Sequence, residues 1–246
     1  MDQAKRKLFI NSLSRALDRE NALTKREDGM ALPDFVEPFD YSHGPQESMF
    51  KDLSREEILD MFFKECDKNG TKYVRTTEAN LPQTVIEAIN SWGNGVVAYP
   101  SVPEVDSLGI KAAFDADTSG ERTYIQWDPA LGREVNLENI NKADIGVTFA
   151  CAGIAETSTV IQPSTAESGR ALSLIPDTHI AIVWADTIFP RMTQSMEFLA
   201  EEFRKDPEKF PRNVVHISGP SRTADIELVT VDGAHGPIKV TYIVID

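Results

Sequence analysis

The sequence predicts a three-layer α/β domain with a mostly parallel sheet over residues 54–246, preceded by an N-terminal helix and an extended arm over residues 1–53. Short apolar segments typical of buried strands alternate with helical segments, and this alternation is typical of βαβ units. The chain has 246 residues, of which 41% are hydrophobic and 26% charged, as in soluble globular proteins. A chain of this length buries a large core without disulfides or metals.

The N-terminal region is predicted to form a helix followed by an extended segment. Leu8, Leu13 and Leu17 recur at helical spacing and predict an amphipathic helix over about residues 4–21. Residues 24–53 hold scattered glycines and prolines without any periodicity, which indicates an extended arm and the main domain boundary. The apolar stripe of the helix packs either on its own domain or on a partner protein.

The predicted domain begins at Ser54, where Ser54 and Glu57 have the spacing of a capping box. The helix that starts there ends at Asn69-Gly70, and a second helix starts at Pro82. A third, longer helix is predicted from the spacing of Ile188, Met192, Met196, Leu199 and Phe203. Strands are predicted at 72–75, 95–99, 124–127, 144–150, 157–161, 179–184, 214–217 and 238–245.

Charge and cysteine content narrow the classes of function. The formal net charge is −14, so general binding to a phosphate backbone is disfavoured. Two cysteines favour a reducing compartment over a disulfide-linked secreted domain. No secretory signal and no membrane-spanning segment is visible, and we therefore expect a cytoplasmic protein.

The common catalytic motifs are absent from the sequence. It contains no phosphate-binding G-x-x-x-x-G-K-[ST] loop, and Gly93-Asn94-Gly95 is not followed by a third glycine and a helix. The H-E-x-x-H, C-x-x-C and G-x-S-x-G motifs are missing too. A cubane iron–sulfur cluster normally takes four thiolates, so we expect no such cofactor in this chain.

The first candidate site is the loop after the predicted strand at 214–217. Ser218, Gly219, Ser221, Arg222 and Thr223 precede a predicted helix, whose first N–H groups and Arg222 would attract a phosphate or carboxylate. The alternative is structural: Ser221 and Thr223 cap the helix, and Arg222 pairs with Asp225 or Glu227.

The second candidate is Glu156, the lone acidic residue between Val147 and Ile161. A carboxylate in an apolar neighbourhood is costly unless it is paired, and it could serve as a general base, a nucleophile or a ligand anchor. Alternatively it lies in a surface hairpin, or pairs with Arg170 or Arg222.

Two further residues have chemistry of interest. His235, in the turn 232–237, could carry protons, although a turn histidine commonly just faces water. Cys151, beside Gly153, is either a reactive thiol or a small buried residue.

Several blocks of the sequence resemble the lactate utilization protein C family, which carries the LUD domain and is also called the YkgG or LutC group. The blocks are 143–148, 154–157, 169–176 with 179–183, 217–227 with 233–237, and the N-terminal stretch 9–17. Where the family typically has glycine after the Glu-Thr pair, this chain has Ser158, which leaves less room for a ligand near the backbone.

The resemblance implies a fold of the NagB/RpiA/CoA transferase-like type, shared with ribose-5-phosphate isomerase and formyltetrahydrofolate cyclo-ligase. It also implies a role in oxidising L-lactate to pyruvate together with partner proteins, one of which carries iron–sulfur clusters. Iron–sulfur clusters in a partner protein agree with the presence of only two cysteines in this chain.

Three hypotheses follow. In the first, the chain is a subunit of an L-lactate oxidising system and binds a small anion in a crevice near Glu156 and Arg222. In the second, it is a stand-alone acyl or CoA transferase, or a sugar-phosphate isomerase, that uses Glu156 as its catalytic residue. In the third, it is a non-catalytic assembly scaffold. The candidate ligand-binding residues are Thr157, Ser218, Gly219, Ser221, Arg222, Thr223 and His235.

Overall fold

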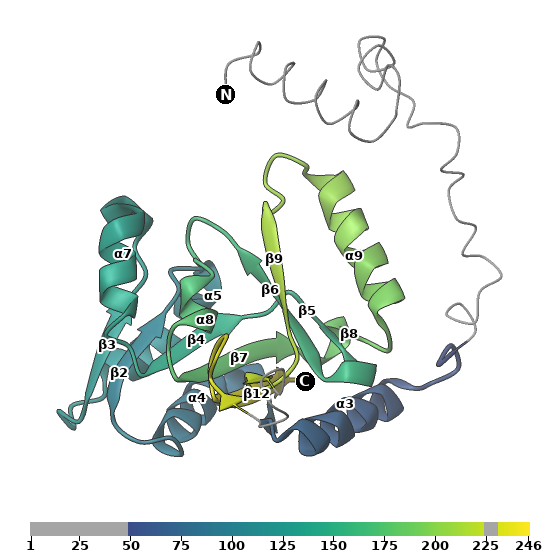
Figure 1. The fold of residues 1–246 in the computed structure, drawn as a ribbon, viewed down its shortest axis with the longest axis horizontal. Helices are drawn as coiled ribbons and strands as arrows, with labels where there is room; N and C mark the ends of the chain where they lie inside the picture. Colours follow the sequence, from purple (N-terminus) through teal and green to yellow (C-terminus); the bar gives the residue numbers. More distant parts are fainter. Residues whose placement is uncertain (1–48, 224–230) are drawn as a thin grey trace, which may run out of the picture. The chain divides into compact units, whose positions relative to one another are not determined.

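The computed structural model describes residues 49–223 and 231–246, which fall almost entirely within a compact unit, Phe50–Asp246. The helix predicted at 4–21 and most of the arm predicted at 24–53 lie outside the described residues. Within the described ranges, a parallel sheet of six strands and a mixed sheet of four form the framework (Figure 1). None of the helices in this part of the chain has the length and apolar character that crossing a membrane requires.

The larger sheet confirms the predicted parallel architecture. In the order β1-β12-β7-β4-β2-β3, every neighbouring pair of strands is parallel. Its strands are β1 (Lys72–Thr76), β2 (Gly95–Tyr99), β3 (Arg122–Gln126), β4 (Ile145–Phe149), β7 (Thr178–Trp184) and β12 (Lys239–Ile245). The apolar strand β7 lies between β12 and β4 and is buried on both faces, as its sequence predicts.

One face of this sheet is covered by three helices. They are α4 (Leu81–Asn90), α5 (Pro103–Ser107) and α6 (Ile110–Asp115). Pro82 lies in the first turn of α4, where its missing N–H leaves no hydrogen bond unmade. Val85 and Ile89 of α4 pack against Ile180 and Ile243 of the sheet, in a core that excludes water completely.

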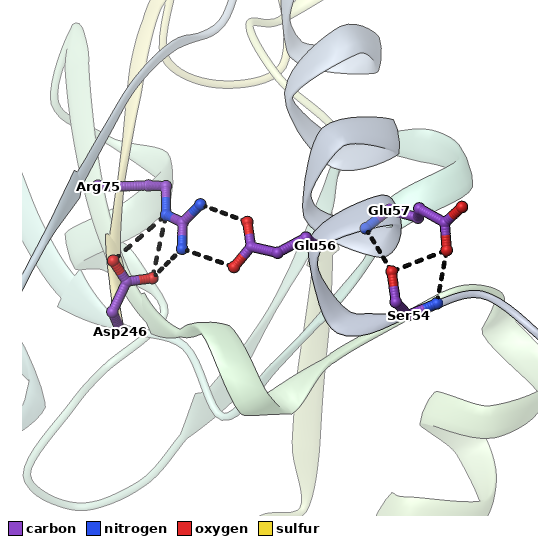
Figure 2. A network of polar contacts seen from close by, with 5 residues as sticks. All are labelled: Ser54, Glu56, Glu57, Arg75 and Asp246. Carbon is purple, nitrogen blue, oxygen red and sulfur yellow. Dashed lines mark hydrogen bonds and ion pairs between the residues drawn. The ribbon is translucent and has the colours of Figure 1, made fainter.

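The opposite face is covered by α3 (Arg55–Asn69), α7 (Gly132–Ile140) and α8 (Ala171–Leu174), and by the smaller sheet. The predicted capping box of α3 is formed: the Ser54 hydroxyl accepts from the backbone N–H of Glu57, and the Glu57 carboxylate accepts from the backbone N–H of Ser54 (Figure 2). At its other end, Gly70 closes α3 in the left-handed conformation, with φ of 79°.

A network of charged groups connects α3 to the edge of the larger sheet. Arg75 of β1 donates to the carboxylates of Glu56 on α3 and of Asp246 after β12, each at 2.7 Å (Figure 2). The hydrogen bond from Arg75 lowers the pKa of Glu56 below its ordinary value. The network therefore joins three segments that are far apart in the sequence.

The smaller sheet corrects the sequence analysis. Its order is β8-β5-β6-β9, with β6 antiparallel to both β5 and β9. The strands are β5 (Ala152–Ile154), β6 (Thr159–Ser164), β8 (Ile188–Phe189) and β9 (Asn213–Ile217). The predicted strand at 157–161 thus starts two residues later, and the strand at 214–217 does not join the parallel sheet. The four residues 155–158 between β5 and β6 permit only an antiparallel hairpin, because parallel strands need a long crossover.

The long helix α9 (Met192–Lys205) covers the smaller sheet and also differs from the prediction. Ile188 belongs to β8 and not to the helix. Leu199 is buried against Ala152 and Ile154, but the side chains of Met192, Met196 and Phe203 are about half exposed, at 53%, 47% and 50%. The narrow sheet offers apolar contacts to only part of the predicted stripe.

Candidate functional site

Glu156 lies in the short turn Ala155–Thr157 between β5 and β6, and its carboxylate is paired with Arg191. The guanidinium Nε of Arg191 is 3.0 Å from one carboxylate oxygen and 2.9 Å from the other. The backbone N–H of Glu156 donates to the carbonyl of Pro190 at 3.1 Å. The structure therefore anchors Glu156 to the segment between β8 and α9. The salt-bridge interpretation holds, but Arg191 is the partner, in place of Arg170 or Arg222.

The next three residues of this turn and strand form a polar cluster with two residues from elsewhere in the chain. We define the polar cluster as Asn69, Thr157, Ser158, Thr159 and Ser218. The Asn69 amide donates to the Ser158 hydroxyl at 2.7 Å, and the Ser158 hydroxyl donates to the carbonyl of Thr157 at 2.8 Å. The Thr159 hydroxyl lies 2.7 Å from that of Thr157 and 2.6 Å from that of Ser218. The structure thus brings together the two loops that the sequence singles out.

Ser158 occupies a backbone conformation that favours glycine. Its φ of 44° and ψ of 45° are left-handed, and it is fully buried. Glycine, the residue that the resemblance leads us to expect here, adopts this conformation without the cost of a Cβ atom. In this chain, the two hydrogen bonds of the Ser158 hydroxyl offset the conformational cost of a side chain.

Gly219 also has a left-handed backbone, with φ of 78°, and it lies against the polar cluster. A Cβ atom here would come within 2.7 Å of the Asn69 amide nitrogen and the Thr71 hydroxyl. Its backbone N–H donates to the Tyr242 hydroxyl at 3.0 Å, and that hydroxyl donates to the carbonyl of Ile217 at 2.9 Å. Burial raises the pKa of Tyr242 above its ordinary value, so the phenol stays neutral and can donate.

The helix predicted to begin after Ser221 is not formed at its first residues. Arg222–Thr223 is instead strand β10, which pairs antiparallel with β11 (Val231–Asp232). The backbone N–H of Ser221 donates to Pro237, and its carbonyl accepts from Gly233. These bonds hold the segment extended against the turn before β12, which excludes a helix start at Arg222. The rest of the predicted helix, residues 224–227, lies outside the described residues.

Arg222 lies over the carboxyl end of α3. Its Nη2 atom is 3.1 Å from the position that a Cβ atom of Gly70 would take. Its Nε atom is 3.6 Å from a carboxylate oxygen of Asp232, and both side chains are more than half exposed. A cation at this end of a helix is stabilised by the partial negative charge of the last carbonyls. No hydrogen bond or ion pair among the described residues joins Arg222 to Glu156.

Of the remaining candidates, Ser221 and His235 are neighbours. The Ser221 hydroxyl accepts from the backbone N–H of His235 at 3.1 Å, and His235 is exposed. Thr223 pairs with Val231 across the β10–β11 hairpin. The predicted site is therefore divided into three parts: Glu156 with Arg191, the polar cluster with Gly219, and the hairpin that carries Ser221, Arg222, Thr223 and His235.

Both cysteines are protonated at neutral pH. Burial raises the pKa of Cys66 to about 12 and that of Cys151 to about 11. The Cys151 thiol donates to the carbonyl of Ile161 at 3.4 Å. Because the thiolate is the reactive and metal-binding form, neither side chain has the properties of a nucleophile or a cluster ligand in this conformation.

The described residues also line a cavity of about 470 Å³, open to solvent, between α7, α8 and the loop 164–170. None of the eight predicted site residues lines it. Two arginines do, Arg133 and Arg170, each directly after a glycine at the beginning of a helix. Neither arginine was predicted as a site residue, because neither lies in the loops after β4 and β9 on which the prediction was based. A search for arginines at Gly-Arg helix starts would have found both.

Comparison with known proteins gives consistent matches along the chain. The model of the LUD domain family matches residues 59–245. A "Lactate utilization protein C" from Macrococcus caseolyticus is 36% identical over 97% of this chain and 94% of its own length. Proteins of the same name from Bacillus licheniformis and Bacillus subtilis are each 32% identical, over 97% and 96% of this chain and 95% and 94% of their own lengths.

A solved structure has the same fold. The crystal structure of a DUF162 family protein from Deinococcus radiodurans superimposes with a TM-score of 0.55 and 27% identity. The match covers 79% of this chain and 99% of that one. The α/β fold with its mostly parallel sheet is therefore shared with a protein of known structure.

Proposed function

This chain belongs to the LUD domain family, among the lactate utilization protein C proteins, and from this premise we propose that it is a component of an L-lactate utilization system. The proposal rests on one observation: identities of 31% to 36% to proteins of that name along nearly the full length of both chains. In the system that we propose, L-lactate loses two electrons and two protons to become pyruvate.

The electrons pass, in this proposal, to iron–sulfur clusters in partner proteins. The two thiols of this chain support that assignment, because both are held protonated and a cubane cluster normally takes four thiolates. The chain purified under anaerobic conditions with a tag from lactate-grown cells should carry along a brown protein with iron and acid-labile sulfide. Purification without any iron from such cells would contradict the assignment.

The role in lactate utilization is tested by deleting the gene in its own host. Growth on L-lactate as the sole carbon source should be lost, and growth on pyruvate should continue, because the product of the oxidation bypasses the missing step. Reintroducing the full chain should restore growth on lactate. Unchanged growth of the deletion strain on lactate would refute the proposed function.

The predicted small-anion site near Glu156 and Arg222 remains part of the proposal. What supports it is the exposed Arg222, whose contact with Asp232 is long and whose guanidinium lies over Gly70, the residue after Asn69 of the polar cluster. L-lactate, pyruvate and phosphate are the probes. Isothermal titration should show binding that Arg222→Gln weakens and that Arg212→Gln, a change of another exposed arginine, leaves unaltered. Equal binding by both variants would exclude Arg222 from the site.

The stand-alone transferase or isomerase requires a free Glu156 carboxylate. The contact of both Glu156 oxygens with Arg191 instead favours an anchoring role. Incubating the purified chain with an acyl-CoA and analysing the intact mass distinguishes the two. A covalent adduct on Glu156 would establish the transferase and displace the subunit role. The scaffold hypothesis rests on the N-terminal helix, which lies outside the described residues.

A further inference from the structure

The cavity between α7 and α8 is lined by parts of the chain that other contacts hold in place. Trp127 forms part of its wall, and the indole N–H donates to the carbonyl of Ala166 at 2.9 Å. On α7, the buried Asn136 side chain hydrogen-bonds to both backbone polar groups of Asp128, at 3.0 and 2.7 Å. Hydrogen bonds within the chain thus hold this part of the wall in place.

Close packing also fixes the loop that closes the cavity. A Cβ atom on Gly169 would lie 2.2 Å from the Trp127 ring, so only glycine fits there. Thr165 and Ser168 exchange hydrogen bonds within the same loop. The volume of about 470 Å³ lies within the range of about 300–1,000 Å³ found for ligand pockets.

The charged side chains that line this cavity are positive, whereas the net charge of the chain is negative. Its ionisable lining side chains are Arg133 and Arg170, and no carboxylate lines it. In a chain with 39 acidic and 25 basic residues, a wall with two cations and no acid is unusual. Glu134, Glu138 and Glu167 are close in sequence but do not belong to the lining.

Neither arginine is neutralised within the described part of the chain. Arg133 and Arg170 make no ion pair with any residue in 49–223 or 231–246. Both guanidinium groups therefore have donors available, and a guanidinium matches phosphate and carboxylate with paired hydrogen bonds. The anionic group of a ligand has two sites of attachment in this cavity.

Apart from the uncharged polar residues Asn136, Ser164 and Thr165, the rest of the lining is apolar or glycine. Leu137, Leu174 and Ile175 line the cavity with Trp127, and the side chains of Leu174 and Ile175 are partly exposed, at 37% and 41%. A ligand that covered them would gain the hydrophobic contribution of the buried surface. A three-carbon hydroxy acid such as lactate would leave most of the volume empty, so the cavity fits a larger molecule.

We infer that this cavity binds an organic anion in which a phosphate or carboxylate is joined to an apolar body, with the charged group at Arg133 and Arg170 and the body against Trp127 and Leu174. This site is separate from the polar cluster and from Arg222, and the inference does not depend on the role in lactate utilization.

The test is isothermal titration of the full chain with four probes. Octyl phosphate and octanoate carry a phosphate and a carboxylate on an apolar chain; 1-octanol has such a body without the charge, and inorganic phosphate the charge without the body. We expect octyl phosphate or octanoate to bind, which also identifies the anionic group, and we expect 1-octanol and inorganic phosphate to bind at least tenfold more weakly. Equally tight binding of inorganic phosphate in this cavity, or no binding of octyl phosphate and octanoate, would overturn the inference.

Variants assign the binding to this cavity. Arg133→Gln and Arg170→Gln should each weaken it by about ten- to a hundredfold, the effect of losing a charged hydrogen bond. The matched variant Arg212→Gln, at an exposed arginine outside the cavity, should leave it unchanged. Leu174→Glu should abolish binding by repulsion, and Leu174→Lys should preserve it. Thermal unfolding verifies that each variant is folded. Binding that is indifferent to Arg133 and Arg170 would refute the assignment.

Discussion

At the scale of single residues, Ser158 shows how the polar cluster depends on one strained backbone conformation. A non-glycine residue in the left-handed region costs about 1–2 kcal/mol. Ser158 occupies it with φ of 44° while its hydroxyl accepts from Asn69 and donates to Thr157. The side chain therefore brings both a cost and a compensating pair of hydrogen bonds.

Two substitutions separate these contributions. Ser158→Ala keeps the strain and loses the hydroxyl, so we expect the free energy of unfolding to fall by about 1–3 kcal/mol. Ser158→Gly also loses the hydroxyl but relieves the strain, so it should be more stable than the alanine variant by about 1 kcal/mol. Urea denaturation at neutral pH measures both. An alanine variant as stable as the glycine variant would show that position 158 carries no strain.

His179 is a second residue whose environment has a measurable consequence. It is fully buried in β7, where its Nε2 atom lies 2.7 Å from the Thr148 hydroxyl. Burial lowers the pKa of His179 from its ordinary 6.5 to about 4. Between these two values the unfolded chain binds a proton at this position and the folded chain does not, so stability declines as the pH falls from about 6.5 to about 4.

This linkage predicts a pH dependence that one substitution removes. Of the stability that the protein loses between pH 6.5 and pH 4, His179 should account for roughly 3 kcal/mol. The free energy of unfolding of His179→Gln should fall by correspondingly less over that interval. The exposed control, His216→Gln, should lose as much stability as the unaltered chain. Denaturant titrations at several pH values give the comparison. Parallel curves for His179→Gln and the unaltered chain would contradict the buried, neutral histidine.

At the scale of elements, α3 shows how strongly local sequence can specify a helix. Ser54 and Glu57 satisfy donors at its first turn, and Gly70 closes its last (Figure 2). The helix then positions Asn69, which belongs to the polar cluster, and its carboxyl end underlies Arg222. The carboxyl end of α3 thus helps to position both the polar cluster and Arg222.

Removing the cap should therefore weaken the whole domain. We expect Ser54→Ala to lower the free energy of unfolding by about 1 kcal/mol, because the N–H of Glu57 loses its acceptor. Ser107→Ala, at an exposed position whose side chain makes no hydrogen bond to residues 49–223 or 231–246, is the control and should change little. Chemical denaturation compares the two; equal stabilities would show that the capping box contributes nothing.

At the scale of the whole described domain, the two sheets are joined through the side chain of Tyr242. This residue lies in the middle of β12, and its hydroxyl bonds to Ile217 at the end of β9 and to Gly219 in the following turn. β12, the last strand of the larger sheet along the chain, therefore holds the turn that places Ser218 in the polar cluster.

Tyr242→Phe tests this connection. The change leaves the ring in place but removes the hydroxyl, so the N–H of Gly219 and the carbonyl of Ile217 lose their partner. We expect the free energy of unfolding to fall by about 1–3 kcal/mol. Hydrogen exchange of the Gly219 amide should accelerate, whereas amides inside β7 should follow only the global change. Tyr73→Phe, at an exposed phenol, is the control. An unaltered Gly219 exchange rate would exclude the proposed connection.

The comparison of sequence and structure separates local from long-range information. The boundaries of α3, β2 and β12 are predicted to within about a residue, because capping residues, a glycine or a continuous apolar run define them locally. The assignment of β9 to the parallel sheet and the helix start at Arg222 are wrong. Both depend on which distant strand supplies the backbone hydrogen bonds, and no local pattern encodes that choice.

The sequence by itself determined the α/β class, the mostly parallel direction of its strands and the family, since periodicity and motifs are properties of short segments. Only the tertiary structure decided that Glu156 pairs with Arg191, that Gly219 bonds to Tyr242, and that Arg133 and Arg170 line one cavity. These pairings join residues 23 to 37 positions apart, because folding places side chains by the packing of layers and not by their spacing along the chain.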